Sequence, residues 1–158
     1  MQKRIIIFFL FSTSFLYSQD QYLNSLKSQD TIYLILKYNK KEVRKEYKTF
    51  FYQTLYNKSL SEYKFQEKNQ PKEVTVRVEY RHEPIKICNK KGHFLNENKG
   101  KIIDINLIET FGIDYIFNTL LKINKQEKVF YVIDERELKK RKITLRKATI
   151  VATGYIKM

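Results

Sequence analysis

Both histidines and the only cysteine of this 158-residue chain lie in one short stretch, HEPIKICNKKGH, which runs from His82 to His93. Imidazole and thiolate groups are common zinc ligands, and together they can form a nucleophile and its base. Zinc ligands usually occur in pairs separated by about two to four residues, whereas the spacing here is H-x5-C-x4-H. A catalytic pair would also need an orienting group and an oxyanion donor, and the spacing indicates neither.

The elements around this stretch argue against a shared site. The valines of EVTVRVEYR, residues 73–81, alternate with polar residues and predict a half-buried strand. Pro84 cannot donate to a sheet ladder and therefore ends or bulges that strand. Beyond it the apolar positions change parity, so the two histidines and the cysteine do not share one face. We interpret the stretch as a strand end, a buried or half-buried thiol at Cys88 and a Lys-Lys-Gly turn that leads to His93. A fold that brings these groups together with Glu83 is the alternative.

Other catalytic patterns are equally weak. The chain holds four glycines, and none belongs to a phosphate-binding loop pattern. The residues Asp134-x-x-Glu137 resemble a paired-carboxylate site, but they also match the start of a helix after a strand, which is the interpretation that we favour. The sequence therefore predicts no catalytic residue, no metal site and no cofactor.

Basic charge is the feature that stands above the background. The segment KKRKITLRK, residues 139–147, has six cationic residues in nine. On a strand, Lys142, Thr144 and Arg146 would share a face, and a row of cations facing solvent suits phosphates or an acidic polysaccharide. The candidate polyanion-binding residues are Lys139, Lys140, Arg141, Lys142, Arg146 and Lys147. The alternative is a charged edge that discourages strand-to-strand aggregation. No motif that reads nucleic-acid bases is present, so no specific nucleic acid is expected.

The first eighteen residues indicate where the protein goes. Residues 1–18, MQKRIIIFFLFSTSFLYS, combine Lys3 and Arg4 with a short apolar run and a small residue at the end. This pattern is typical of a secretory signal peptide, because the run is too short to span a bilayer. A membrane anchor or a buried core strand is the alternative. We predict a mature protein that begins near Gln19, is exported to the periplasm or secreted, and keeps no transmembrane anchor. Its net charge would be about +12, against +14 for the full chain, and its single cysteine allows no internal disulfide.

Residues 19–158 predict a single α+β domain. Strands are indicated by alternating apolar residues and by frequent β-branched and aromatic side chains. They are expected at 30–38, 46–56, 61–67, 73–81, 128–134 and, as one strand or a bent pair, 142–156. The first of these is apolar on both faces, which predicts a central strand. One broken helical segment, about 104–123, should begin at Asp104 or Asn106 and be interrupted at Gly112. Because strands and helix do not alternate regularly, we expect a mainly antiparallel sheet.

Four segments carry a resemblance to other proteins. They are the signal ending SQ and the segments KIIDINLIETFGIDYIF, KVFYVIDERE and ITLRKATI. Together they resemble the small secreted proteins of unknown function that are common in Bacteroidetes. The resemblance implies export and a strand–helix–strand order, and it implies no activity, cofactor or partner.

Two classes of function therefore stay open. The first is a non-catalytic exported domain, in the periplasm or at the cell surface, that binds an envelope protein or an acidic polymer. The second is a small hydrolase or metal-dependent enzyme whose site is assembled from dispersed residues. A concave pocket that joins His82 or His93 to carboxylates would favour the enzyme, and a flat basic face without such a pocket would favour the binding domain.

Overall fold

The computed structural model describes residues 21–22, 24–37, 43–57, 60–69, 73–79, 82–89, 92–113, 115–117 and 128–153. The predicted signal peptide and the end of the predicted helical segment, 118–123, lie outside these residues. Within the described ranges, no helix is long and apolar enough to cross a membrane.

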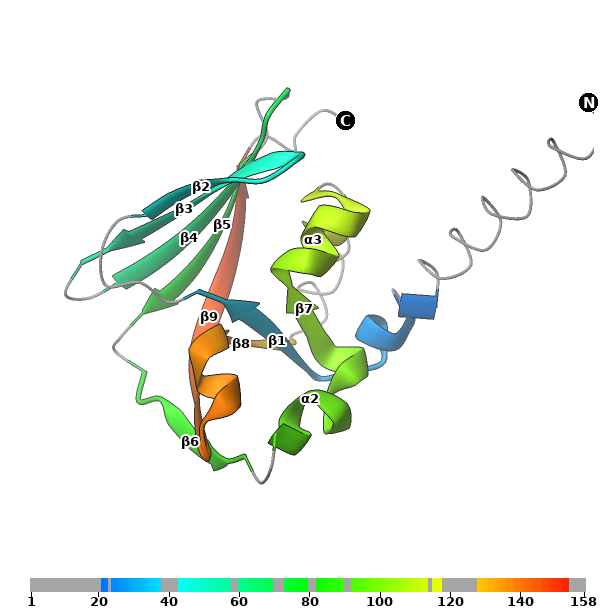
Figure 1. Ribbon diagram of the computed structural model, residues 1–158, viewed down its shortest axis with the longest axis vertical. Helices are drawn as coiled ribbons and strands as arrows, with labels where there is room; N and C mark the ends of the chain where they lie inside the picture. Colours follow the sequence, from blue (N-terminus) through cyan, green and yellow to red (C-terminus); the bar gives the residue numbers. More distant parts are fainter. Residues whose placement is uncertain are drawn as a thin grey trace, which may run out of the picture.

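The described residues form nine strands in one curled, mixed sheet with the shape of a half-barrel (Figure 1). The strands are β1 (Thr31–Leu36), β2 (Val43–Glu46), β3 (Phe50–Tyr56), β4 (Leu60–Glu67), β5 (Glu73–Glu79), β6 (Ile85–Cys88), β7 (Ile102–Asp104), β8 (Val129–Asp134) and β9 (Lys142–Thr153). Their order across the sheet is β2-β3-β4-β5-β9-β8-β1-β7, and β6 also pairs with β9.

The sheet has an antiparallel part and a parallel part. Strands β2, β3 and β4 each pair antiparallel with the next strand in the chain. Strand β9 pairs antiparallel with β5, β6 and β8. In contrast, β1 pairs in parallel with β8 on one side and with β7 on the other. The predicted α+β fold with a mainly antiparallel sheet is therefore wrong, since the protein is mostly β-sheet and the sheet is mixed. Apolar periodicity locates a strand but carries no information on the direction of its partner, and β7, with three residues, is too short to show any period.

The central strands are covered on both faces by two groups of apolar side chains. Side chains alternate along a strand, so neighbouring residues face opposite sides of the sheet. On β1, Ile32 and Leu34 belong to the larger core, whereas Tyr33 packs against the smaller one. On β9 the corresponding pair is Ile150 in the larger core and Ile143 in the smaller. This arrangement confirms the prediction of a central strand at 30–38.

Helix α3 (Ile105–Phe111) packs on the concave side of the half-barrel through Ile108, which is fully buried in the larger core (Figure 1). The carboxylate of Asp104 caps its start and accepts a hydrogen bond from the Leu107 backbone N–H at 2.8 Å. Gly112, with φ at +85°, ends it. Both features were predicted, and helical residues follow at 113 and 115–117.

The remaining described helices are short. A helical segment at 21–22 and 24–27 precedes β1. The others are α2 (His93–Glu97) and two 3₁₀ turns, η2 (Lys99–Lys101) and η3 (Glu135–Lys139). Helices of this length cannot cover a sheet face by themselves, which is why the strands supply most of the core.

Strand β9 is twelve residues long and is shared by two partners along one edge. Arg77 of β5 pairs with Thr149, and Ile85 of β6 pairs with Leu145. Arg77 and Ile85 are therefore eight residues apart in the chain, whereas their partners on β9, Thr149 and Leu145, are only four residues apart. Pro84 lies in this excess segment, directly before β6 and five residues beyond Glu79, the last residue of β5, so the strand ends before the proline and not at it.

The predicted strand at 46–56 is wrong in its extent. The chain turns back at residues 47–49, between β2 and β3, and the Tyr47 backbone N–H donates to the Phe50 carbonyl at 2.8 Å. This turn, Tyr-Lys-Thr, contains no glycine, proline, asparagine or aspartate, and for that reason the sequence shows no turn signal there.

Candidate functional site

Three neighbouring strands deliver polar residues to the same edge of the sheet. Because β8, β1 and β7 run parallel, their carboxyl ends meet at one edge. Lys37 follows the last residue of β1, Glu135 follows the last residue of β8, and Asp104 is the last residue of β7. The carboxyl edge of parallel strands is a frequent place for ligands, because the chain leaves the sheet there and opens a crevice.

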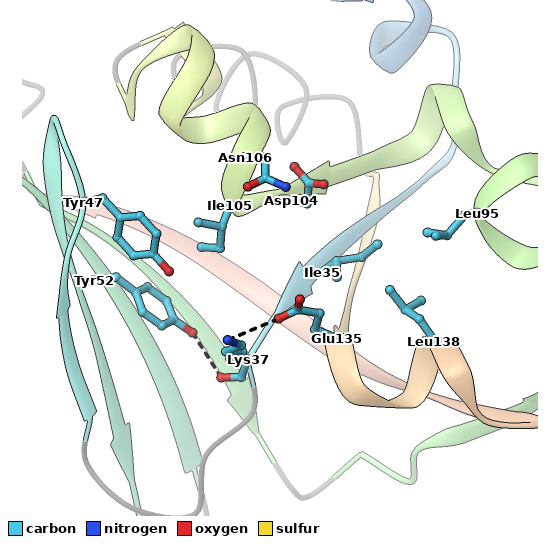
Figure 2. Close-up of a pocket in the computed structure, with 10 residues that line it drawn as sticks. All are labelled: Ile35, Lys37, Tyr47, Tyr52, Leu95, Asp104, Ile105, Asn106, Glu135 and Leu138. Atoms are coloured by element: carbon cyan, nitrogen blue, oxygen red, sulfur yellow. Dashed lines mark hydrogen bonds and ion pairs between the residues drawn. The ribbon is translucent and has the colours of Figure 1, made fainter. Parts of the chain in front are cut away.

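These three residues line a cleft of about 270 Å³, which we call the strand-end cleft (Figure 2). Its other lining residues are Ile35, Tyr47, Tyr52, Leu95, Ile105, Asn106 and Leu138. Figure 2 shows the two tyrosines on one side, the aliphatic residues Leu95 and Leu138 on the other, and the charged side chains between them. Apolar walls with a few convergent polar groups are typical of small-molecule sites.

The charges in the cleft are only loosely paired. Lys37 Nζ lies 3.9 Å from Glu135 Oε2, and the two side chains are 47% and 55% exposed. An ion pair of this length and exposure contributes little to stability, so both charges can interact with a ligand. The Tyr52 hydroxyl donates to the Lys37 carbonyl at 3.2 Å and thereby fixes the backbone from which the lysine side chain extends.

The Tyr47 hydroxyl is a neutral group in the cleft. Burial, with the negative charges of Glu109 and Glu135, raises the pKa of Tyr47, so the hydroxyl stays protonated at neutral pH. The ring stacks on Phe50 with the centroids 4.7 Å apart. No hydrogen bond joins this hydroxyl to another residue within the described ranges.

A second surface of interest is the basic segment between η3 and β9. We call Lys139–Lys142 the basic turn. Its four side chains are all exposed, as is that of Lys147. In β9, residues 142–145 pair regularly with β6 and residues 146–148 pair regularly with β8. Alternate residues of a strand lie on the same face, so Lys142, Thr144 and Arg146 share a face, as predicted.

Arg146, however, does not extend to solvent with the other cations. Its guanidinium donates to Glu137 Oε1 at 2.9 Å, and the two side chains are only 16% and 12% exposed. Glu137 Oε2 also accepts from the Thr144 backbone N–H at 2.9 Å. Although burial of the carboxylate opposes the effect, these hydrogen bonds and the Arg146 charge lower the pKa of Glu137.

Asp134 has a similar role one turn earlier. Its side chain accepts from the Arg136 backbone N–H at 3.0 Å and so caps η3, which confirms the predicted helix start. The Arg136 guanidinium also contacts both carboxylate oxygens, with the shortest distance 2.7 Å. The pair Asp134 and Glu137 is therefore engaged with arginines and backbone groups.

A buried amide holds the backbone of the basic turn. Asn89, which is 4% exposed, follows the last residue of β6. Its side-chain nitrogen donates to the carbonyls of Leu138 at 2.8 Å and Lys140 at 3.0 Å. Its backbone N–H donates to the Arg141 carbonyl at 2.7 Å. With three carbonyls directed inward, the cationic side chains of the turn are displayed from an anchored backbone.

The residues of the HEPIKICNKKGH stretch are only partly brought together. Cys88, His93 and Glu97 help to line a second cavity of about 260 Å³, whereas His82 does not. The prediction of a buried or half-buried thiol is wrong: Cys88 is exposed, because β6 lies at the edge of the sheet and packs on the smaller core through Ile87. In the described part of the chain, no group of three or more His, Cys, Asp and Glu side chains could hold a metal ion.

No family model, no curated protein and no solved structure matches this chain. The resemblance to small secreted proteins of Bacteroidetes therefore stays a prediction, as do export and the signal peptide.

The strand-end cleft was missed at the level of sequence. Its signal was present, since Lys37 and Glu135 each come directly after an apolar strand. That signal becomes informative only when the two strands are known to be parallel and adjacent.

Proposed function

We propose that this protein is an exported, non-catalytic domain that binds an acidic polymer through the basic turn. The observation that carries the proposal is a contrast in charge pairing. Arg136 and Arg146 are paired with Asp134 and Glu137. No carboxylate within the described ranges forms an ion pair with the side chains of Lys139–Lys142.

Electrostatics favours a polyanion as the partner. Four adjacent cations repel one another, and a chain of phosphates, sulfates or carboxylates relieves that repulsion while it releases its own counterions. The anchored backbone reduces the conformational entropy that is lost on binding. The predicted export makes an anionic polymer of the cell envelope the natural partner.

The alternative function, a small hydrolase, is favoured by the second cavity, because His93, Glu97 and Cys88 are all among the residues that line it. It is the weaker candidate, because no hydrogen bond within the described ranges joins Cys88 to His93. A nucleophile and its base are expected within hydrogen-bond reach.

The proposal is tested by the double substitution Lys140→Glu and Arg141→Glu. We expect wild-type protein to be retained on immobilised heparin and on immobilised polyphosphate, and to elute at a salt concentration well above about 0.1 M. The double variant should elute at markedly lower salt on both matrices. Retention on heparin alone would indicate a sulfated or carboxylated polymer, and retention on polyphosphate alone would indicate a phosphate polymer.

The matched control is the double substitution Lys27→Glu and Lys99→Glu. Both lysines are exposed and lie outside the basic turn, and the change in net charge is the same. This variant should elute close to wild type. If the two double variants lose the same retention, the charge acts diffusely and the basic turn is not a binding site.

A further inference from the structure

The strand-end cleft carries charges of both signs within an otherwise apolar crevice. One ammonium group, Lys37, and two carboxylates, Asp104 and Glu135, line it. The loose pairing of Lys37 with Glu135 leaves both charges exposed to a ligand. In a chain with a net charge of +14, a local excess of negative charge is unusual and selects for ligands with a cationic group.

The size of the cleft restricts the ligand. Its volume of about 270 Å³ is slightly below the range of roughly 300–1,000 Å³ that drug-sized ligands occupy. A ligand of only a few carbon atoms therefore fits, and it must present opposite charges close together.

The walls of the cleft add an apolar requirement. Ile35 is buried under the cleft at 6% exposure, and Leu95 and Leu138 stand on the side opposite the tyrosines (Figure 2). Leu95 is 41% exposed, so a ligand that covers it removes apolar surface from water.

We propose that the strand-end cleft binds a free α-amino acid with an aliphatic side chain. The ligand carboxylate would pair with Lys37 and the ligand ammonium with Glu135 and Asp104, while its side chain contacts Leu95 and Leu138. The Tyr47 hydroxyl, which lines the cleft, would supply a neutral hydrogen-bond donor to the carboxylate.

A sugar fits these walls less well. Sugar rings commonly use an open aromatic face, but Tyr52 is only 1% exposed and Tyr47 is stacked on Phe50. The cleft also offers three charged groups, whose desolvation a neutral sugar would not offset.

The experiment compares L-leucine with two analogues that each lack one charge. N-acetyl-L-leucine has no ammonium, and isoamylamine has no carboxylate. L-leucine should raise the melting temperature of the full chain in a concentration-dependent way, because a ligand of the folded state stabilises it. Each analogue should need a concentration at least about tenfold higher than that of L-leucine to shift the melting temperature equally, because a hydrogen bond to a charged group is lost.

Two substitutions locate the binding. Lys37→Met and Glu135→Gln should each weaken leucine binding about tenfold in calorimetry. Both positions are exposed, so the fold should be retained. The matched controls are Lys99→Met and Glu97→Gln, which remove the same charges from exposed positions outside the cleft and should bind leucine like wild type.

Three results would overturn the proposal. The first is a melting temperature that neither leucine, isoleucine nor valine changes. The second is equal binding of leucine and both analogues, which would mean that only the apolar contact matters. The third is unchanged leucine binding in both cleft variants, which would place the site elsewhere.

Discussion

At the scale of single residues, Asn89 connects the segment around β6 and α2 to the end of η3, about fifty residues further along the chain. Its amide nitrogen donates to the carbonyls of Leu138 and Lys140, and its amide oxygen accepts from the Phe94 backbone N–H at 3.3 Å. The end of β6, the end of η3 and the start of α2 therefore depend on one buried side chain. Satisfied buried polar groups specify one geometry, because any other leaves several groups without partners.

We predict that Asn89→Ala destabilises the protein by about 1–3 kcal/mol, the cost of leaving buried backbone groups unpaired. The midpoint of urea unfolding should fall at an unchanged slope. The matched control is Asn98→Ala, since this amide also donates to a carbonyl, that of Phe94 at 2.9 Å, but is only half-buried. Water can replace its hydrogen bond, so its midpoint should stay nearer to wild type. Equal midpoints for the two variants would contradict the role assigned to Asn89.

The role of a residue could be predicted from the sequence where composition alone determines it, but not where contacts in the folded chain determine it. The cations from Lys139 to Lys147 are plain in the sequence. The sequence does not show that Arg146 is neutralised, because its partner Glu137 lies nine positions earlier and contacts Arg146 only after β8 and β9 pair. Asn89 carries no signal at all, since a single asparagine after a strand usually marks an exposed turn.

At the scale of elements, a side chain of η3 takes over where the pairing of β8 with β9 ends. Val132 of β8 pairs with Arg146, so the next positions of β9 would lack a partner on that side. The Glu137 carboxylate accepts from the Thr144 backbone N–H and occupies that place. A charged side chain thus satisfies a backbone N–H of β9 beyond the last pair with β8.

This contact predicts a pH dependence of stability. The pKa of Glu137 is lower in the folded protein than its ordinary value of 4.5 in the unfolded chain. The contribution of Glu137 is therefore fully present above the unfolded pKa and is lost as the pH falls through the folded pKa. The urea midpoint of Glu137→Gln should lie below wild type at neutral pH, and the gap should narrow as the pH falls below the unfolded pKa and through the folded one. A gap that stays constant across this range would show that the carboxylate charge is not involved.

Elements were predicted better than their arrangement. The alternation of residues 73–81 and the apolar run at 30–38 produced correct strands, and Asp104 and Gly112 correctly bounded a helix. The β2–β3 hairpin was missed because its turn lacks turn-forming residues. The strand-end cleft was missed because it depends on parallel pairing between strands about a hundred residues apart, which is a property of topology.

At the scale of the whole molecule, one sheet supports two cores. The larger core fills the concave side and contains Val76, which is fully buried. The smaller core covers the other face and contains Ile143, which is also fully buried. Because β1, β8 and β9 carry side chains into both, neither core can be lost without disrupting strands that support the other.

We therefore predict that the two cores unfold together. Val76→Ala should cost about 1–3 kcal/mol and Ile143→Val about 0.5–1.5 kcal/mol, because each leaves a cavity in a packed region. Both variants should show a single urea transition, with fluorescence and circular dichroism coincident and the midpoint shifted down. A chelator should leave the wild-type midpoint unchanged, since apolar packing supplies the stability. Two separate transitions in the Ile143→Val variant would mean that the smaller core is an independent unit, and a large shift with chelator would mean that a metal contributes to the fold.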